Sequence, residues 1–152
     1  MYVIVDPIND DTKGITTYSN LLYGLLRKNN IETFLIRKRS GQDIESFYGC
    51  ITQKIDIKKH IFEIPDSYCY FFNKEARVHI RLHGNQAVLQ KSQGHSIDVD
   101  RQKAEENRIL DSQYVSSPSE QNFLETAKFI RIENCLIYPN PVPEGETISQ
   151  RP

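Results

Sequence analysis

The chain has 152 residues, of which 38% are hydrophobic and 26% charged, proportions typical of one globular domain with a sizeable core. Lysine and arginine (19) nearly balance aspartate and glutamate (20), so no net field favours nucleic acid or an anionic membrane, and no nucleic-acid partner is expected. The three cysteines lack C-x-x-C spacing, which favours free thiols in a reducing compartment. No apolar run approaches the roughly 20 residues that span a bilayer. The acidic N-terminus does not resemble a secretory signal, so the cytoplasm is the expected location.

The first 36 residues predict a strand, a loop, a helix and a second strand. Tyr2 to Asp6 is a short apolar run, typical of a strand buried on both faces. Residues 7–14 have the composition of a loop, and apolar residues then recur at helical spacing from Ile15 to Leu26. Glu32 to Ile36 is the second predicted strand, and such a crossover is right-handed in nearly all known cases.

The middle of the chain has weaker patterns. They predict a strand at residues 49–51, a short helix at 57–64 that ends before Pro65, and a strand at 68–72. Residues 77–82 alternate apolar and polar side chains, which predicts a strand with one polar face that ends at His83 and Gly84. Residues 101–110 predict a charged helix.

The end of the chain has the clearest order of elements. Residues 114–143 contain a strand, a serine-rich turn, a helix, a short apolar strand at 136–138 and a proline-rich stop. Because strands alternate with helices, the sequence predicts an α/β fold with a parallel sheet, whose strand ends open onto a ligand crevice. We expect one domain over residues 1–143 and a polar linker or tail over residues 144–152.

The loop between the first strand and the first helix is a candidate phosphate site. Helix N-termini present free N–H groups and a positive dipole end, and Gly14 would let a ligand approach the backbone closely. Thr16, Thr17 and Ser19 can donate hydroxyl hydrogen bonds. A plain turn with a helix cap is the alternative, because neither G-x-G-x-x-G nor G-K-[ST] is present.

Histidines and serines near the other strand ends are further candidates. On a strand, His79 and His83 lie roughly 13 Å apart at about 3.3 Å per residue, too far to share one ion, so no metal site is expected. His83 ends a strand with Gly84, where ligands bind in parallel sheets; a structural role at the strand end is the alternative. Four residues around the closing turn can touch a polar ligand or cap the helix: Tyr114, Ser116, Ser117 and Ser119.

These segments together resemble the N-terminal domain of GT-B fold glycosyltransferases of the family 4 type, the glycosyltransferase group 1 relatives. The resemblance spans most of residues 1–143. The motifs that carry it are KGITTYSNLLYGLL at 13–26, Pro65-Asp66 before a predicted aromatic strand, VHIRLHG at 78–84, and the stretch from ILDSQYVSSPSEQ to YPNPVP at 109–143. The last of these is the most specific.

The resemblance implies a Rossmann-like, doubly wound, mostly parallel sheet with helices on both faces, which is one half of a GT-B architecture. This half would hold mainly the acceptor, and a C-terminal domain with paired glutamates, to which nothing here corresponds, would hold mainly the nucleotide-sugar donor. The implied site has His83 as the catalytic residue, near the reacting sugar. The implied substrate- and donor-binding residues are Lys13, Gly14, Thr16, Gly84, Ser116, Ser117 and Ser119.

A protein of this type would transfer a sugar from a nucleotide sugar to a glycan or lipid-linked acceptor in bacterial surface polysaccharide synthesis. It would need no metal or other cofactor and would work in the cytoplasm, with peripheral association at the inner face of the membrane. The chain alone would fold but be inactive, since its donor site is incomplete. Two features depart from the family pattern: Lys13-Gly14 replaces a pair of glycines, and the segment between Phe72 and Val78 is short.

Two other functions are compatible with the sequence. One is a non-enzymatic α/β module that binds a ligand or a protein partner. The other is a different Rossmann-like enzyme that uses a mononucleotide, against which the missing glycine fingerprint argues. Recognition of nucleotide sugars would distinguish the transferase from the binding module.

Overall fold

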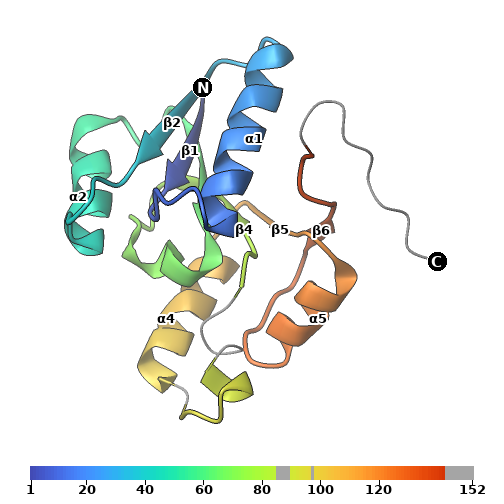
Figure 1. Ribbon diagram of the computed structural model, residues 1–152. Helices are drawn as coiled ribbons and strands as arrows, with labels where there is room; N and C mark the ends of the chain where they lie inside the picture. The colour runs from blue at the N-terminus through green and yellow to red at the C-terminus, as the bar shows by residue number, and fades with distance from the viewer. Residues whose placement is uncertain (85–89, 97, 143–152) are drawn as a thin grey trace.

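The computed structural model describes residues 1–84, 90–96 and 98–142. They form a six-stranded parallel sheet in the order β2-β1-β3-β4-β5-β6 (Figure 1). The strands are β1 (Tyr2–Asp6), β2 (Thr33–Arg37), β3 (Ile61–Pro65), β4 (Arg77–Arg81), β5 (Tyr114–Ser117) and β6 (Leu136–Ile137). The helices are α1 (Gly14–Lys28), α2 (Ile44–Lys54), the 3-10 helix η1 (Asp66–Phe71), α4 (Val99–Leu110) and α5 (Glu120–Ala127). This confirms the predicted α/β, Rossmann-like fold.

The direction in which strands are added reverses once. The chain first places β2 on one side of β1 and then adds β3 to β6 on the other side. With right-handed crossovers, α1 therefore covers one face of the sheet, while α2, η1 and α4 cover the opposite face. The reversal puts a topological switch point between β1 and β3, and in sheets of this kind ligands bind outside the carboxyl ends of the strands at that point.

The two faces of the sheet differ in chemistry because side chains alternate along each strand. The face toward α2, η1 and α4 is apolar and holds the core: Val3, Val5, Phe62, Ile64, Val78, Ile80 and Val115, packed with Phe47, Tyr48, Ile51, Phe72 and Ile109. The face toward α1 carries polar side chains that are almost as deeply buried: Glu63, His79, Arg81 and Ser116. The molecule thus has an apolar core on one side of the sheet and a buried polar layer on the other.

Three predicted elements in the middle of the chain are wrong. Residues 49–51 belong to α2, which Asp43 caps by accepting a hydrogen bond from the Ser46 N–H at 3.0 Å. Residues 57–64 contain β3 rather than a helix, because the charged Glu63 that interrupts the apolar run is buried inside the sheet. Residues 68–71 belong to η1 rather than to a strand, and Phe71 and the following Phe72 pack against the Tyr48 ring of α2.

The elements at both ends of the chain agree with the sequence. The structure confirms the first strand and helix, the strand that ends at Arg81, the charged helix α4, and the closing order β5-α5-β6. The predicted linker at residues 144–152 lies outside the described residues. Among the described residues, no helix is both long and apolar enough to cross a membrane.

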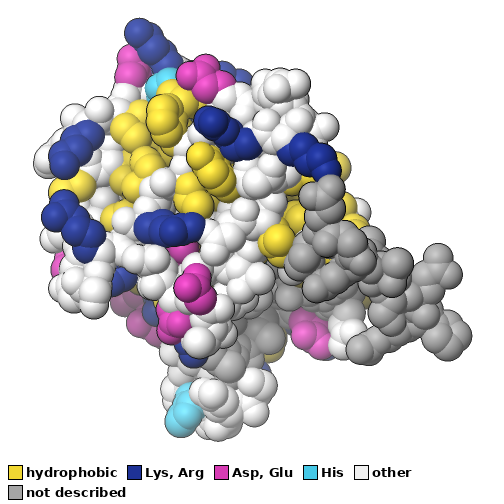
Figure 2. Space-filling view, turned by 45° about the horizontal axis from the view of Figure 1, so that its top comes forward, with side chains coloured by type: hydrophobic (Ala, Val, Ile, Leu, Met, Phe, Trp, Pro, Cys, Tyr) yellow, Lys and Arg dark blue, Asp and Glu magenta, His cyan; other side chains and the backbone are white. Residues whose placement is uncertain are grey.

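The amino edge of the sheet, where the strands begin, is partly apolar. Figure 2 turns this end of the molecule toward the viewer and shows hydrophobic side chains gathered between lysine and arginine side chains. The exposed Ile31 lies here, in a shallow groove of about 320 Å³ that Lys59 and Arg77 also line. The candidate residues from the sequence lie at or near the opposite, carboxyl edge, with the exception of Tyr114, which begins β5 and therefore lies at the amino edge.

Candidate functional site

The loop between β1 and α1 is held in place by one buried carboxylate. The Asp6 Oδ1 atom accepts hydrogen bonds from the backbone N–H groups of Ile8 and Asn9, both at 3.0 Å, and from the Thr16 hydroxyl at 3.1 Å. The Thr16 hydroxyl also accepts from the backbone N–H of Asp10 at 3.0 Å. Thr16 is fully buried, so its hydroxyl fixes the loop from within rather than facing the solvent.

Lys13 and Gly14 stand at the point where this loop becomes α1. Lys13 is exposed and precedes the first helical residue, and no side chain caps the helix there. A Cβ atom added to Gly14 would meet no other atom within 4 Å. The packing of the protein therefore does not require a glycine at this position, which leaves room for a ligand to approach the backbone.

The ends of β3 and β4 are joined by Asp66. Its Oδ1 atom accepts the backbone N–H of His83 at 3.0 Å, and the neighbouring Ser67 hydroxyl donates to the Gly84 carbonyl at 2.5 Å. Burial raises the pKa of Asp66 to about 6, although backbone N–H groups of His83, Gly84 and Ser67 lower it. Gly84 has a φ of 156°, a conformation that side chains rarely adopt. The side chains of Asp66 and Ser67 thus hold the His83-Gly84 segment in place.

His83 lies against the first helix. Its ring meets the Tyr18 ring of α1 edge-on, with 4.7 Å between the ring centroids. Burial, assisted by the positive charge of Arg81, lowers the pKa of His83 to about 4, against the opposing effect of Glu63, which raises it. The imidazole is therefore neutral near pH 7 and can either donate or accept a hydrogen bond.

The serines of the closing segment have mostly internal roles. Ser116 and Ser117 are the last residues of β5 rather than part of the turn, and both are fully buried. The Ser117 hydroxyl donates to the Ser119 carbonyl at 2.8 Å. The exposed Ser119 caps α5 by accepting from the Asn122 N–H at 3.0 Å, which confirms the predicted capping role. Of the three serines, only Ser119 is exposed at the carboxyl edge.

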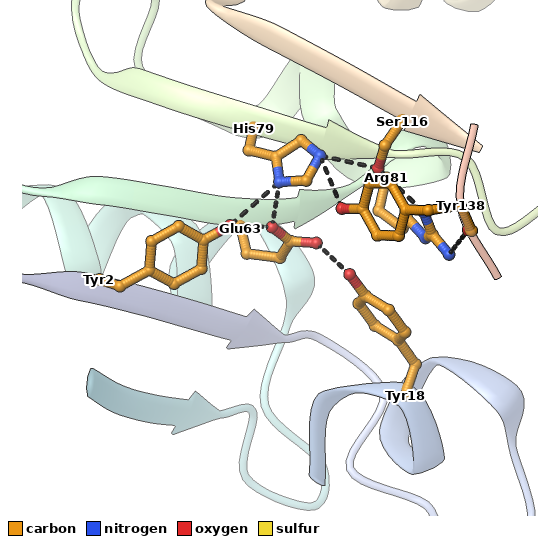
Figure 3. A network of polar contacts seen from close by, with 7 residues as sticks. All are labelled: Tyr2, Tyr18, Glu63, His79, Arg81, Ser116 and Tyr138. Atoms are coloured by element: carbon orange, nitrogen blue, oxygen red, sulfur yellow. Dashed lines mark hydrogen bonds and ion pairs between the residues drawn. The ribbon is translucent and has the colours of Figure 1, made fainter. Parts of the chain in front are cut away.

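A buried polar network crosses the face of the sheet beneath α1 (Figure 3). The Glu63 carboxylate accepts from the Tyr18 hydroxyl at 2.5 Å and from the Tyr2 hydroxyl, and it lies 2.5 Å from His79 Nδ1. Burial raises the pKa of Glu63, but the hydrogen bonds from His79, Tyr18 and Tyr2 outweigh it and hold this pKa below the usual value. The other ring nitrogen of His79 lies 2.7 Å from the Ser116 hydroxyl oxygen.

Arg81 completes this network. Its guanidinium lies over the rings of Tyr18 and Tyr138, at 5.1 Å and 4.3 Å from their centroids. It donates to the Ser116 hydroxyl at 3.1 Å, the Tyr138 carbonyl at 2.9 Å and the Asn140 side-chain oxygen at 2.7 Å. The network therefore links β1, β3, β4, β5 and α1 to the segment that follows β6.

Ser116, His79 and Glu63 have the spacing of a serine-histidine-acid triad. A catalytic serine must reach a substrate carbonyl, however, and the Ser116 hydroxyl is fully buried and already accepts from Arg81. The arrangement therefore joins strands rather than presenting a nucleophile. Among the residues that the structure describes, no group of three or more histidine, cysteine or acidic side chains is placed to hold a metal ion.

Sequence reasoning missed the residues that organise the site. Asp6 and Asp66 lie at strand ends and are both 0% exposed, and Glu63 is the central residue of β3 and is 2% exposed. Asp6 and Asp66 directly end or follow apolar strands, which is a signal that the sequence does carry. The pairing of Glu63 with His79 has no local signal, because it depends on the register of β3 against β4. Comparisons of the chain with protein-family models, curated proteins and solved structures found no match.

Proposed function

We propose that this chain is the N-terminal, acceptor-side domain of a nucleotide-sugar-dependent glycosyltransferase. The observation that supports this most is the meeting of two ligand-facing elements at the carboxyl edge. The start of α1, with Lys13 and Gly14, and the turn His83-Gly84 approach each other through the contact between Tyr18 and His83. The start of α1 follows β1, which borders the switch point, and His83-Gly84 follows β4, the second strand on the other side of it; α/β sheets of this type bind ligands outside the strand ends in this region.

The chemistry of these elements suits a sugar with a nearby phosphate. The uncapped N-terminus of α1 offers N–H groups to an anionic or strongly polar group. His83 is neutral near pH 7, so it would hydrogen-bond a sugar hydroxyl rather than pair with a phosphate charge. In the proposed reaction the bond between the sugar and the diphosphate breaks and a bond to an acceptor hydroxyl forms. The acceptor loses its proton and the nucleoside diphosphate leaves, with the catalysis supplied by positioning and charge stabilisation.

Further parts of the proposal concern the rest of the protein. A second domain with paired glutamates would hold most of the donor, and the acceptor would be a glycan or a lipid-linked sugar of a bacterial surface polysaccharide. The enzyme would act in the cytoplasm, peripherally at the inner face of the membrane, without a metal. The first residues to test at the carboxyl edge are His83, Lys13, Gly14, Gly84 and Ser119.

The test compares two glycine substitutions in the protein encoded by the complete gene. Gly14→Ala would add a methyl group at the ligand side of α1, and Gly49→Ala would add one in α2, where a Cβ likewise meets nothing within 4 Å. Each should leave the fold intact or stabilise it by up to about 1 kcal/mol. In a screen of nucleotide sugars for acceptor-dependent release of nucleoside diphosphate, Gly14→Ala should cut turnover at least tenfold and Gly49→Ala should not. Equal activity of the two variants would contradict the proposed site.

A non-enzymatic binding module is the second candidate. It is favoured by the internal use of the Thr16, Ser116 and Ser117 hydroxyls, which leaves few polar side chains for chemistry at the edge. Such a module would bind a sugar or phosphate ligand at the same turns without releasing a product. Saturable binding with no release of nucleoside diphosphate for any donor would therefore favour the module over the transferase.

A further inference from the structure

Within the part of the chain that the structure describes, Arg81 is a buried cation that has no negatively charged partner. Its side chain is 0% exposed, and none of the ion pairs among the described residues includes it. Glu63, the acid of this network, already pairs with His79 and accepts hydrogen bonds from the hydroxyls of Tyr2 and Tyr18. Buried charges are normally paired with an opposite charge, because taking an ion out of water is costly. The described groups that Arg81 contacts are instead neutral: the hydroxyl of Ser116, the rings of Tyr18 and Tyr138, the Tyr138 carbonyl and the Asn140 amide.

The guanidinium also has unused hydrogen-bonding capacity. The Arg81 Nε atom is buried and has no hydrogen-bond partner. The remaining donors reach three neutral oxygens, on Ser116, Tyr138 and Asn140. An arginine fork matches the paired oxygens of a phosphate or carboxylate, and a charge-assisted contact of that kind is about twice as strong as one to a neutral oxygen.

Two of the three acceptors belong to a thin covering segment, residues 138–142. The Tyr138 N–H donates to the Ser117 carbonyl at 3.1 Å, but Pro139 and Pro141 have no N–H to donate. Tyr138 is 37% exposed and Asn140 is also exposed, so solvent lies directly outside this segment. Figure 3 shows Arg81 behind the Tyr138 ring. The guanidinium is thus one side-chain layer from solvent, at the carboxyl end of β4 and two residues before His83.

We propose that Arg81 is an oxyanion-binding residue, and that a phosphate or carboxylate group of a ligand takes the place of the Asn140 side chain. The anion supplies the missing negative charge and faces the fork from the side that residues 138–142 now cover. This inference stands apart from the sugar-transfer proposal, because it concerns a charge and not a reaction. An inorganic oxyanion is therefore a sufficient probe.

The decisive variant is Asn140→Asp, which places a carboxylate where the amide oxygen now lies, 2.7 Å from Arg81. If the cation lacks a partner, this exposed substitution should raise the melting temperature and occupy the anion site. Asn134→Asp is the matched control, because it adds the same charge at an exposed asparagine that makes no contact with Arg81 among the described residues. It should leave both the melting temperature and anion binding nearly unchanged.

Binding is measured by calorimetry with phosphate, pyrophosphate and acetate, each at constant ionic strength set with chloride. The 152-residue chain should bind at least one of these oxyanions saturably, with affinity reduced about tenfold or more in Arg81→Gln and in Asn140→Asp. Acetate binding alone would identify a carboxylate site, and phosphate or pyrophosphate binding a phosphoryl site. The proposal is overturned if no oxyanion binds, or if Asn140→Asp behaves like Asn134→Asp. Asn140→Asp decides the matter even if Arg81→Gln does not fold, since Asn140 lies at the surface.

Discussion

Protonation of His83 should destabilise the protein in mild acid. In the unfolded chain His83 has its ordinary pKa of 6.5, whereas burial lowers the pKa in the folded protein to about 4. Between these values the unfolded state binds more protons than the folded state. The stability that neutral His83 contributes is therefore fully present above pH 6.5 and is lost as the pH falls toward 4.

The size of this effect follows from the two pKa values. A shift of this extent corresponds to an upper limit of about 3 kcal/mol in the free energy of unfolding, and the half-buried position of the ring reduces it to about 2 kcal/mol. His83→Gln cannot take up the proton, so the stability advantage of the wild type over this variant should shrink by that amount between pH 7 and pH 4.5.

The assay is urea unfolding of the wild type and of His83→Gln at several pH values in that range. His95→Gln, at an exposed histidine, is the matched substitution against which the pH dependence is compared. The reasoning would be refuted if the difference between the wild type and His83→Gln stayed constant with pH. In that case the ring would be solvated in the folded protein, and its proposed role as a neutral hydrogen-bonding group would fail.

Other substitutions test the organisation of the site and the fold. Burial raises the pKa of Asp66 from 3.8 to about 6, so the folded protein loses stability as the pH rises through this interval, and the loss is complete above pH 6. In urea titrations the stability of Asp66→Asn relative to the wild type should therefore increase by up to about 3 kcal/mol between pH 4 and pH 7. A difference that does not change with pH would contradict this. Glu63→Gln should lower the free energy of unfolding by about 3 kcal/mol or more at pH 7, because it places an amide among tyrosine donors and leaves His79 without its acidic partner. A decrease below about 1 kcal/mol would argue against a tightly coupled network. Ser119→Ala should lower the free energy of unfolding by about 1 kcal/mol, measured by thermal unfolding, because α5 loses its cap. Oxyanion binding at Arg81 should not change.

The parts of the fold that follow a strong local pattern were predictable. The apolar run of β1, the helical stripe of α1 and the alternation along β4 each reflect burial that recurs at a regular spacing, so the sequence alone indicates them. The order of strands and helices then implies a parallel sheet and places His83 and Gly84 at its carboxyl edge.

The missed parts depend on contacts between distant segments. Glu63 made β3 look interrupted, because only the folded sheet brings His79 beside it and satisfies its charge. The same holds for Ser116, whose hydroxyl faces the sheet network instead of the turn because its strand continues to residue 117. In the sequence Arg81 is one charged residue in an alternating strand, and only the structure reveals that it is buried without a counter-charge among the described residues.

The central claim is that the carboxyl edge of the sheet, around Gly14 and His83-Gly84, is the ligand site. The most direct test is amide chemical-shift mapping of the protein encoded by the complete gene during titration with a panel of nucleotide sugars at millimolar concentration. The account predicts that at least one of them shifts the amides of Gly14, His83 and Gly84 in a saturable manner, with little change at the amino edge near Ile31. Shifts confined to the amino edge, or no saturable shift with any nucleotide sugar, would contradict it.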